Sequence, residues 1–288
     1  MELYQLQYFL AIADTKGFTK AADRLFVSQP SLSAGIKKLE KELGVLLFDR
    51  GGRQVTLTPA GQFFHERARK ILTEHESVIR DLQAFQGLPL LRLGALCTLR
   101  IATLAALIRD FRSRFPYVSI ELRNGSLEEV QAWLQQGDID VAMTLVPPDD
   151  CSDSCCLFSQ SLLLAVADSH PIAQWSVFDL AELDDVPFIE RIKCEILRPR
   201  APQMFGALGI QPRAVYRADN EEWVISLVQS GMGITIMPQW RDLTGVTYLP
   251  IIDTKLSRSV GLQWRTSQRA EHIVQFCDYA SEHDWQVR

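Results

Sequence analysis

The stretch that decides the fold spans residues 21–61 and reads AADRLFVSQPSLSAGIKKLEKELGVLLFDRGGRQVTLTPAG. Its apolar residues recur at three- and four-residue spacings and predict two helices, over residues 19–26 (or from Phe18) and about 29–43. Upstream, residues 2–14 show the same periodicity and predict a first helix, which ends at Gly17. Two short helices joined by a tight turn behind a third helix are the arrangement of a helix-turn-helix.

The second helix of this pair has a polar outer face. Ser28 is a suitable N-cap, and Pro30 fits the first turn because a proline loses no hydrogen bond there. In a helix-turn-helix this helix enters the major groove, where Gln29, Ser31 and Ser33 can donate to and accept from base edges. Lysines further along can neutralise phosphates. The predicted DNA-binding residues of this region are Thr19, Ser28, Gln29, Pro30, Ser31, Ser33, Lys37 and Lys38.

Residues 45–58 predict a hairpin that completes a winged helix-turn-helix. Gly51 and Gly52 form its tip, and apolar and polar residues alternate on the return strand. Arg50 and Arg53 flank the tip and are predicted to contact the DNA backbone or the minor groove. The alternative is a three-helix scaffold with a solvated lysine face. The cap, the wing and the arginines together favour DNA binding.

The charge is unevenly distributed along the chain. The sequence carries 30 Lys and Arg against 35 Asp and Glu, a net charge of −5. Residues 1–70 hold 11 basic and 7 acidic side chains, or +4, which leaves −9 for residues 71–288. Because phosphate binding requires only a local basic face, the acidic total does not argue against DNA binding.

Residues 59–85 predict one long helix, capped by Thr58 and started by Pro59. Its apolar positions alternate spacings of four and three, which is typical of two-stranded helical pairing. The small N-terminal domain offers no obvious partner for so long a seam, so we predict a homodimer that reads an inverted repeat in double-stranded DNA. The alternative is packing on the chain's own C-terminal domain. The seam comprises Phe64, Ala68, Ile71, His75, Val78, Leu82 and Phe85.

Over about residues 3–65 the sequence, including the run quoted above, resembles the N-terminal signature of LysR-type transcriptional regulators. The resemblance implies that Gln29, Ser31, Ser33 and Arg53 fall at DNA-contacting positions. It also implies a homotetramer, built as a dimer of dimers, that alters the access of RNA polymerase to a promoter. Many members carry an arginine just after the second serine, where this chain has Ala34, so a relative's operator sequence does not transfer.

From about residue 90 onward, predicted strands and helices alternate in two consecutive series, which indicates largely parallel sheets and two subdomains with a cleft between them. The expected fold class is therefore α/β, with an α-rich winged helix-turn-helix domain over residues 1–58. A linker and dimerisation helix over 59–88 and a regulatory domain over 89–288 are expected to follow. The resemblance implies a regulatory domain similar to type 2 periplasmic binding proteins. Its subdomain 1 would span about 89–161 and 265–288 and its subdomain 2 about 162–264, with crossings near 159–162 and 262–266.

A small-molecule effector is expected beyond the carboxyl ends of the strands, where helix N-termini point N–H groups inward. The resemblance places Thr98, Thr144, Cys194 and Asn220 near effector-contact positions. In the alternative interpretation, Thr98 and Asn220 are simple helix caps. The predicted effector-binding residues are Thr98, Leu99, Arg100, Thr144, Cys194, Arg198 and Asn220.

Two of these residues indicate the charge of the effector. Arg100 and Arg198 would pair with an anion, although Arg198 also fits a plain surface position. An anionic effector is therefore the expectation.

The six cysteines support an alternative function, a thiol-based redox-sensing regulator of the same architecture. Some family members sense peroxide through thiols, but the corresponding position here falls on Ile196 and not on Cys194. The cluster CSDSCC, residues 151–156, lacks the second cysteine pair or the histidines of a zinc site. Free thiols, with no cofactor and no metal, are the expectation.

Other classes of protein fit the sequence less well. No nucleophile elbow, phosphate-binding loop or dinucleotide fingerprint indicates an enzyme. A solute-binding protein would need export, yet the first residues carry no basic n-region or long apolar run, and no stretch reaches the length of a membrane span. A nucleoid-type architectural binder would lack the second domain. A cytoplasmic location without membrane contact is expected.

Overall fold

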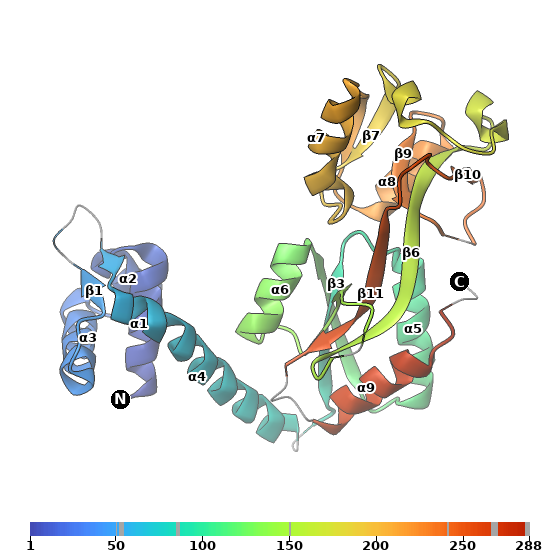
Figure 1. Cartoon of the computed structure of the whole chain (residues 1–288). Helices are drawn as coiled ribbons and strands as arrows, with labels where there is room; N and C mark the ends of the chain where they lie inside the picture. Colours follow the sequence, from blue (N-terminus) through green and yellow to red (C-terminus); the bar gives the residue numbers. More distant parts are fainter. Residues whose placement is uncertain are drawn as a thin grey trace. The chain divides into compact units, whose positions relative to one another are not determined.

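The computed structural model describes residues 1–49, 51, 55–84, 87–149, 151–240, 242–265 and 270–285. The chain divides into two compact units, Met1–Gln86 and Gly87–Arg288, and each is described by itself (Figure 1). Among the described residues, no helix is both long enough and apolar enough to cross a membrane. Nor do the described residues contain a group of three His, Cys, Asp or Glu side chains that could hold a metal ion.

The N-terminal unit is a helical domain with a small hairpin. Its elements are α1 (Leu3–Thr15), α2 (Phe18–Arg24), α3 (Gln29–Leu43), β1 (Phe48–Asp49), β2 (Thr56–Leu57) and α4 (Pro59–Ala84). The predicted helices at 2–14, 19–26 and 29–43 are thus confirmed within two residues at each end. Phe9, Leu32 and Ile36 are fully buried in the core between these helices. The buried amide of Gln5 in α1 donates to the Gly35 carbonyl in α3 at 3.2 Å and fixes the two helices against each other.

The hairpin is held to α3 by one buried carboxylate. Glu40 Oε1 accepts the backbone N–H groups of Leu47 at 2.9 Å and of Phe48 at 3.3 Å. Strand β1 then pairs antiparallel with β2, which confirms the predicted wing. Arg50 and Arg53, the predicted tip arginines, lie outside the described residues.

The predicted apolar seam on α4 is buried near the start of the helix and exposed further along it. At its start, Thr58 caps the helix by accepting the Gly61 N–H at 3.0 Å. The Phe64 ring packs on Phe9 at 5.0 Å, and Ala68 is buried in the domain core. The expectation that the seam has no partner in its own domain was therefore wrong for these first residues, because the first part of α4 packs on α1. Further along, Ile71, Val78, Ile79 and Leu82 are exposed.

The second unit contains two lobes, which we call subdomain 1 and subdomain 2. Subdomain 1 contains β3 (Leu90–Leu96), α5 (Ile101–Arg114), β4 (Ser119–Gly125), α6 (Leu127–Gln136), β5 (Val141–Leu145) and α9 (Glu271–Glu282). Strand β3 lies between β4 and β5, parallel to both. The core of subdomain 1 includes Phe111, Phe276 and Val141.

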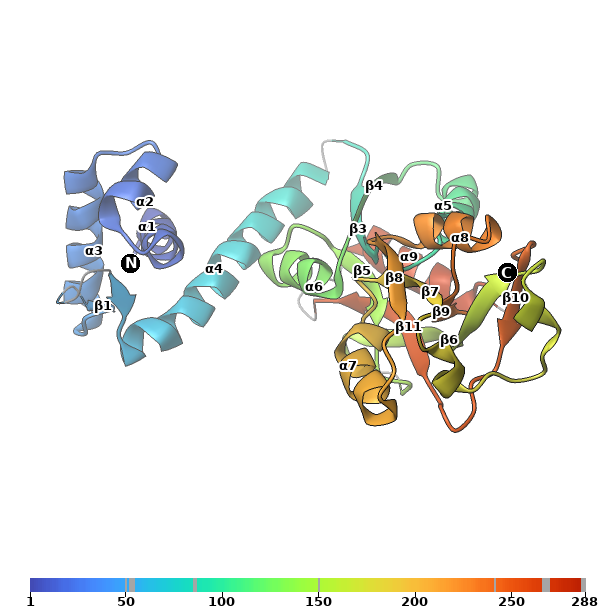
Figure 2. The same cartoon turned by 90° about the horizontal axis from the view of Figure 1, so that it is seen from above.

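Subdomain 2 is built around a second core. It contains the short helices η1 (Pro171–Gln174) and η2 (Leu180–Leu183), and β7 (Pro187–Arg191), α7 (Leu197–Leu208), β8 (Arg213–Ala218), α8 (Glu221–Gln229), β9 (Thr235–Pro238) and β10 (Val246–Leu249). Strands β7 and β8 are parallel. Strand β7 also contacts the start of β9, because the Thr235 hydroxyl donates to the Ile189 carbonyl at 2.7 Å. Helices α5 and α8 lie on the same side of the unit (Figure 2).

Two long strands join the subdomains. They are β6 (Ser154–Ala167) and β11 (Ser257–Trp264), which pair antiparallel and run side by side between the lobes (Figure 1). Strand β6 continues into subdomain 2, where its second half pairs antiparallel with β9 and β10. The prediction of largely parallel sheets was therefore wrong at the centre of the unit. The predicted crossing near 159–162 lies within β6, at the point where this strand leaves subdomain 1.

The return crossing also lies earlier than predicted. Ser257 already pairs with Ser161, and Val260 and Leu262 are buried in the core of subdomain 1. Subdomain 2 accordingly ends near Leu256, whose carbonyl accepts the Leu162 N–H at 2.8 Å, and not near residue 264. The residues on both sides of Leu256 are polar, DTK before it and SRS after it, so the local pattern does not mark the boundary.

Candidate DNA-binding surface and effector cleft

The predicted recognition helix α3 presents its polar face to solvent. Leu32, Ile36 and Leu39 are buried on the opposite face. Ser28 caps the helix, because its hydroxyl accepts the Ser31 N–H at 3.3 Å. The predicted contact residues that are exposed are Thr19, Ser28, Gln29, Pro30, Ser31, Lys37 and Lys38, whereas Ser33 is half-buried.

The exposed face of α3 has the geometry that base reading needs. Gln29, Ser33 and Lys37 follow one another at four-residue spacing and therefore share one line along the helix. The amide of Gln29 stands at the N-terminal end, the end that points toward base edges in this class of domain. Ala34, where many LysR-type regulators carry arginine, is exposed beside this line and offers only a methyl group.

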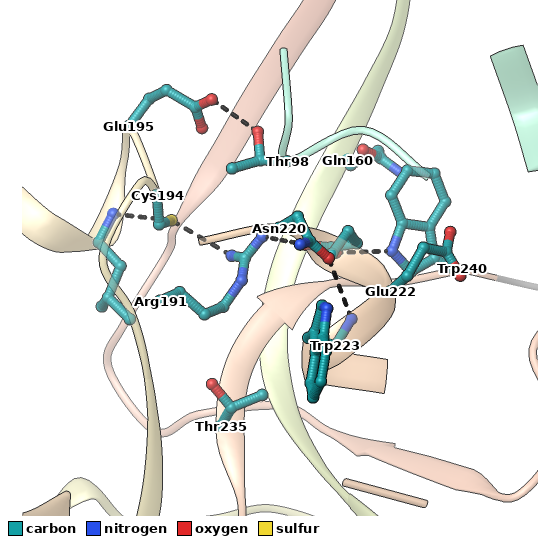
Figure 3. Close-up of polar contacts among 12 residues, drawn as sticks. Thr98, Gln160, Arg191, Cys194, Glu195, Asn220, Glu222, Trp223, Thr235 and Trp240 are labelled. Carbon is teal, nitrogen blue, oxygen red and sulfur yellow. Dashed lines mark hydrogen bonds and ion pairs between the residues drawn. The ribbon is translucent and has the colours of Figure 1, made fainter. Parts of the chain in front are cut away.

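A buried polar cluster lies where subdomain 1 meets subdomain 2. The Thr98 hydroxyl, just after β3, donates to Glu195 Oε1 of subdomain 2 at 2.6 Å (Figure 3). Arg258, near the start of β11, donates from Nη1 to Thr98 Oγ1 and from Nη2 to the Thr98 carbonyl, both at 3.2 Å. Gln160 in β6 accepts from Nε and Nη2 of the same guanidinium at 3.1 and 2.9 Å. The cluster therefore joins both subdomains and both crossing strands.

A second buried pair lies inside subdomain 2. Arg191, at the end of β7, forms an ion pair with Glu221, the first residue of α8, and both side chains are almost fully buried. Glu221 also accepts the indole N–H of Trp240 at 2.9 Å. The charge of Glu221 holds the pKa of Arg191 above its ordinary value despite burial, which by itself lowers that pKa. This guanidinium remains charged at every accessible pH.

Further contacts close the subdomains on each other. Arg100, at the start of α5, pairs with Asp242 of subdomain 2. Glu222 in α8 accepts the Ile101 N–H at the N-terminus of α5 at 3.2 Å. The Glu221 N–H donates to the Cys97 carbonyl at 3.2 Å. Arg100 is thus occupied by a carboxylate of the chain itself.

The structure brings some predicted effector residues together and separates others. Thr98 lies at the centre of the polar cluster, and Cys194 immediately precedes Glu195. Thr144 is fully buried in β5, and its hydroxyl has no hydrogen-bond partner among the described residues. Asn220 caps α8 by accepting the Trp223 N–H at 3.1 Å, as the alternative interpretation expects.

Two predicted residues lie elsewhere. Leu99 packs into the core of subdomain 1. Arg198 is exposed and lines a separate cavity of about 320 Å³ in subdomain 2, with Phe188 and Arg217. A larger cavity of about 500 Å³, which includes Gln160 and Trp240 among its lining residues, contains none of the predicted effector residues.

Sequence reasoning missed the charged residues of the cluster. Glu195 and Arg258 become neighbours only when the subdomains close, because 97 positions separate Thr98 from Glu195 and 160 separate it from Arg258. One signal was present: Glu195 is a charged residue in the short apolar run between Cys194 and Leu197. A charge in an apolar run predicts a buried partner but does not name it.

The thiols near the cluster differ in chemistry. Burial, and then the charge of Glu195, raise the pKa of Cys97 to about 11, so this thiol stays protonated and poorly nucleophilic at neutral pH. Burial raises the pKa of Cys277 to about 12. Cys194 is buried, and its sulfur accepts from Arg191 Nη1 at 3.2 Å and from the Leu197 N–H at 3.4 Å.

Two family models match the chain. The model described as the LysR substrate binding domain matches residues 87–285. The model described as the bacterial regulatory helix-turn-helix protein of the lysR family matches residues 3–62.

Relatives match along nearly the whole chain. The uncharacterized HTH-type transcriptional regulator YybE of Bacillus subtilis is 30% identical over 271 residues, 92% of each chain. The DNA-binding transcriptional dual regulator OxyR of Escherichia coli is 31% identical over 274 residues, which cover 92% of this chain and 90% of the relative. A solved full-length OxyR variant of Pseudomonas aeruginosa, 23% identical, has the same fold with a TM-score of 0.60, over 99% of this chain and 96% of that one.

Proposed function

The chain belongs to the LysR family of bacterial transcriptional regulators, and from this membership we propose that it reads a specific DNA sequence under the control of a small molecule bound between its two α/β subdomains. The observation that carries the proposal is the buried polar cluster of Thr98, Glu195 and Arg258, which links the two subdomains. Residues 1–58 would read DNA, 59–88 would link and pair two chains, and 89–288 would sense the effector. The protein would work in the cytoplasm.

DNA reading is proposed to depend on α3. Its buried face, the hydrogen bond from Gln5 to Gly35 and the hydrogen bonds that Glu40 of α3 accepts from the hairpin fix the helix in the domain, while the polar face stays exposed. Gln29 would hydrogen-bond to a base edge, since a glutamine amide both donates and accepts. Lys37 and Lys38 would neutralise phosphates and supply affinity without sequence preference.

Replacing Gln29 by alanine is expected to lower sequence preference more than overall affinity. A base contact of this kind supplies about 1–3 kcal/mol of discrimination, so the ratio of dissociation constants for scrambled and preferred DNA should fall about tenfold. Fluorescence anisotropy at one fixed salt concentration measures this ratio, with a duplex selected from a random library by the wild-type protein as the preferred DNA.

The matched control for this prediction is Gln203→Ala, which removes an exposed glutamine from α7 of the regulatory unit. It should leave both dissociation constants unchanged. Lys37→Ala should weaken binding to both duplexes alike. It should also reduce the slope of the logarithm of affinity against the logarithm of salt concentration by about one. If Gln29→Ala instead weakens both duplexes equally, Gln29 reads no base.

Pairing of two chains is proposed to use the outer half of α4. Val78, Ile79 and Leu82 are 49%, 43% and 60% exposed, and a stripe of this size on a helix normally contacts another apolar surface. Two paired chains would hold two α3 helices about one DNA turn apart, which suits an inverted repeat. Two such dimers would form the tetramer.

Leu82→Glu is expected to shift the protein from dimer or tetramer toward smaller species, because it places a charge in an apolar helix–helix contact. Sedimentation velocity at micromolar concentration measures the change. The control Glu74→Gln alters an exposed residue of the same helix and should leave the assembly intact. An unchanged sedimentation coefficient in Leu82→Glu would place the interface elsewhere.

The effector would act by changing the contacts between subdomains. A ligand shifts a conformational equilibrium only by its differential affinity for the two states. Any molecule that enters between Thr98 and Glu195 must alter the hydrogen bond that now joins them. A coupling of about 1–3 kcal/mol would suffice to change the spacing of the DNA-binding domains and the access of RNA polymerase.

A thiol-based redox regulator is the second candidate. It is favoured by the two hydrogen bonds that the buried Cys194 sulfur accepts from Arg191 Nη1 and the Leu197 N–H. Several relatives are named as hydrogen peroxide-inducible genes activators. Intact-mass analysis after peroxide treatment tests this candidate, and an unmodified Cys194 would remove it.

A further inference from the structure

The cationic groups near the buried polar cluster have little hydrogen-bonding capacity left for a ligand. The guanidinium of Arg258 already makes four hydrogen bonds, to Thr98 Oγ1, to the Thr98 carbonyl and twice to Gln160 Oε1. A guanidinium has five N–H groups, so at most one remains. Arg191 donates to Glu221 and Cys194, and Arg100 pairs with Asp242. An anionic ligand would have to break one of these internal pairs.

Two buried oxygen atoms of the same region, in contrast, lack a hydrogen-bond partner among the described residues. The side chain of Glu195 is 1% exposed, and its Oε2 has no hydrogen-bond donor among the described residues. The nearest ion-pair contact of Oε2 is Arg258 Nη1 at 3.9 Å, which is beyond hydrogen-bond distance. The buried hydroxyl of Thr144 also has no partner among them. A buried oxygen without a donor is costly, and its deficit is made good by any group that brings an N–H or O–H.

The topology brings these two oxygens to one edge of the sheet. Strands β3 and β5 are parallel neighbours, with Ala95 beside Met143. Thr98 lies just beyond the carboxyl end of β3, and Thr144 lies next to Met143 near the carboxyl end of β5. Glu195 reaches this edge from subdomain 2 through its hydrogen bond to Thr98 (Figure 3). Carboxyl ends of adjacent parallel strands are where α/β proteins bind ligands.

We propose that the effector is a small uncharged or cationic molecule that donates an N–H or O–H hydrogen bond to Glu195 Oε2, and that Glu195 excludes carboxylates from this position. The inference rests on the proposed function and differs from the anionic effector that the sequence predicts. A carboxylate here would meet a buried like charge, and the described arginines nearby, Arg100, Arg191 and Arg258, already have partners within the chain. An amide, hydroxyl or ammonium group would instead supply the missing donor. Glu195 is thus the residue that determines the class of effector.

The test uses three probes with one carbon skeleton: butyramide, n-butylammonium and butyrate. Ligand-observed NMR titrations on the full-length wild-type protein measure millimolar dissociation constants. Butyramide or n-butylammonium is expected to bind at least about tenfold more tightly than butyrate, because only they donate to Glu195. In Glu195→Gln the ratio should fall to about one or reverse. This substitution keeps an acceptor for the Thr98 hydroxyl and replaces the open oxygen by an N–H donor.

The matched control is Glu182→Gln, an identical change at an exposed carboxylate of subdomain 2, which should keep the wild-type order. The assignment is overturned if butyrate binds the wild type as tightly as the donor probes, or if Glu195→Gln leaves the ratio unchanged. It is also overturned if none of the probes binds saturably, since the open oxygen then holds only water. If a carboxylate compound changes the DNA affinity of the protein, this ligand class is refuted but the proposed function stands. If no small molecule changes the DNA affinity, the proposed function itself is refuted.

Discussion

Arg191→Met is expected to lower the free energy of unfolding of the regulatory unit by about 3–5 kcal/mol, because it leaves the Glu221 carboxylate buried without its cation. Both side chains of the pair are 2% exposed or less, so water cannot solvate the remaining charge. Trp240 would still donate to Glu221, but a neutral N–H cannot replace a guanidinium. Urea unfolding followed by tryptophan fluorescence measures the effect. All six tryptophans lie after residue 130, so the signal reports the regulatory unit alone.

The double variant Arg191→Met/Glu221→Gln separates the loss of the ion pair from the loss of packing. Glutamine keeps an acceptor for the Trp240 indole and removes the uncompensated charge, so most of the stability should return. Arg213→Met is the control, since Arg213 pairs with Asp185 on the surface at 3.5 Å. Exposed pairs contribute about 0–1 kcal/mol. A similar loss in Arg213→Met and Arg191→Met would show that burial of the pair is irrelevant.

Gly61→Ala is expected to destabilise the DNA-binding unit by about 3 kcal/mol and to abolish DNA binding. A Cβ at this position would lie 2.1 Å from the Leu47 carbonyl oxygen, and that atom cannot move freely because it accepts the Thr58 N–H at 3.0 Å. The wing would have to separate from the start of α4. Limited proteolysis and DNA-binding anisotropy measure the outcome on the full chain.

This prediction opposes intrinsic helix propensity. Gly61 lies in the first turn of α4, and alanine is favoured over glycine in helices by about 0.5–1 kcal/mol. Gly17→Ala is the control in the same domain, because its added Cβ would meet nothing closer than 3.9 Å. Normal DNA binding by Gly61→Ala would mean that the wing does not need its close approach to α4.

The local features of the DNA-binding unit could be predicted because they depend on neighbours in sequence. Ser28 caps α3 as expected, and the glycines at the hairpin tip lie between two strands that do pair. Helix α3 occupies Gln29–Leu43, the range that its periodicity predicts. Caps, turns and amphipathic periods involve residues within a few positions of one another, so one sequence suffices to find them.

Which part of the apolar face of α4 is covered and which part is exposed could not be predicted in the same way. The seam in α4 has one regular period, yet Phe64 and Ala68 are covered by the domain core whereas Val78 and Leu82 are exposed. Periodicity shows that a helix face is apolar, but not which surface covers it. The position of α1 beside the first turns of α4 decided that question.

The buried polar cluster between the subdomains shows the same limit of sequence-based prediction more clearly. The sequence alone determined the recognition helix and the wing, because these follow from local spacing, and its resemblance to LysR-type regulators placed Thr98 near an effector-contact position. Only the tertiary structure decided that Arg100 is already paired, that Asn220 is a helix cap, and that Glu195 and Arg258 meet at Thr98. The physical reason is sequence separation: a buried charge needs a partner, but any of many distant residues could supply it. The crossing of β6 and β11 selects that partner by bringing the two subdomains together.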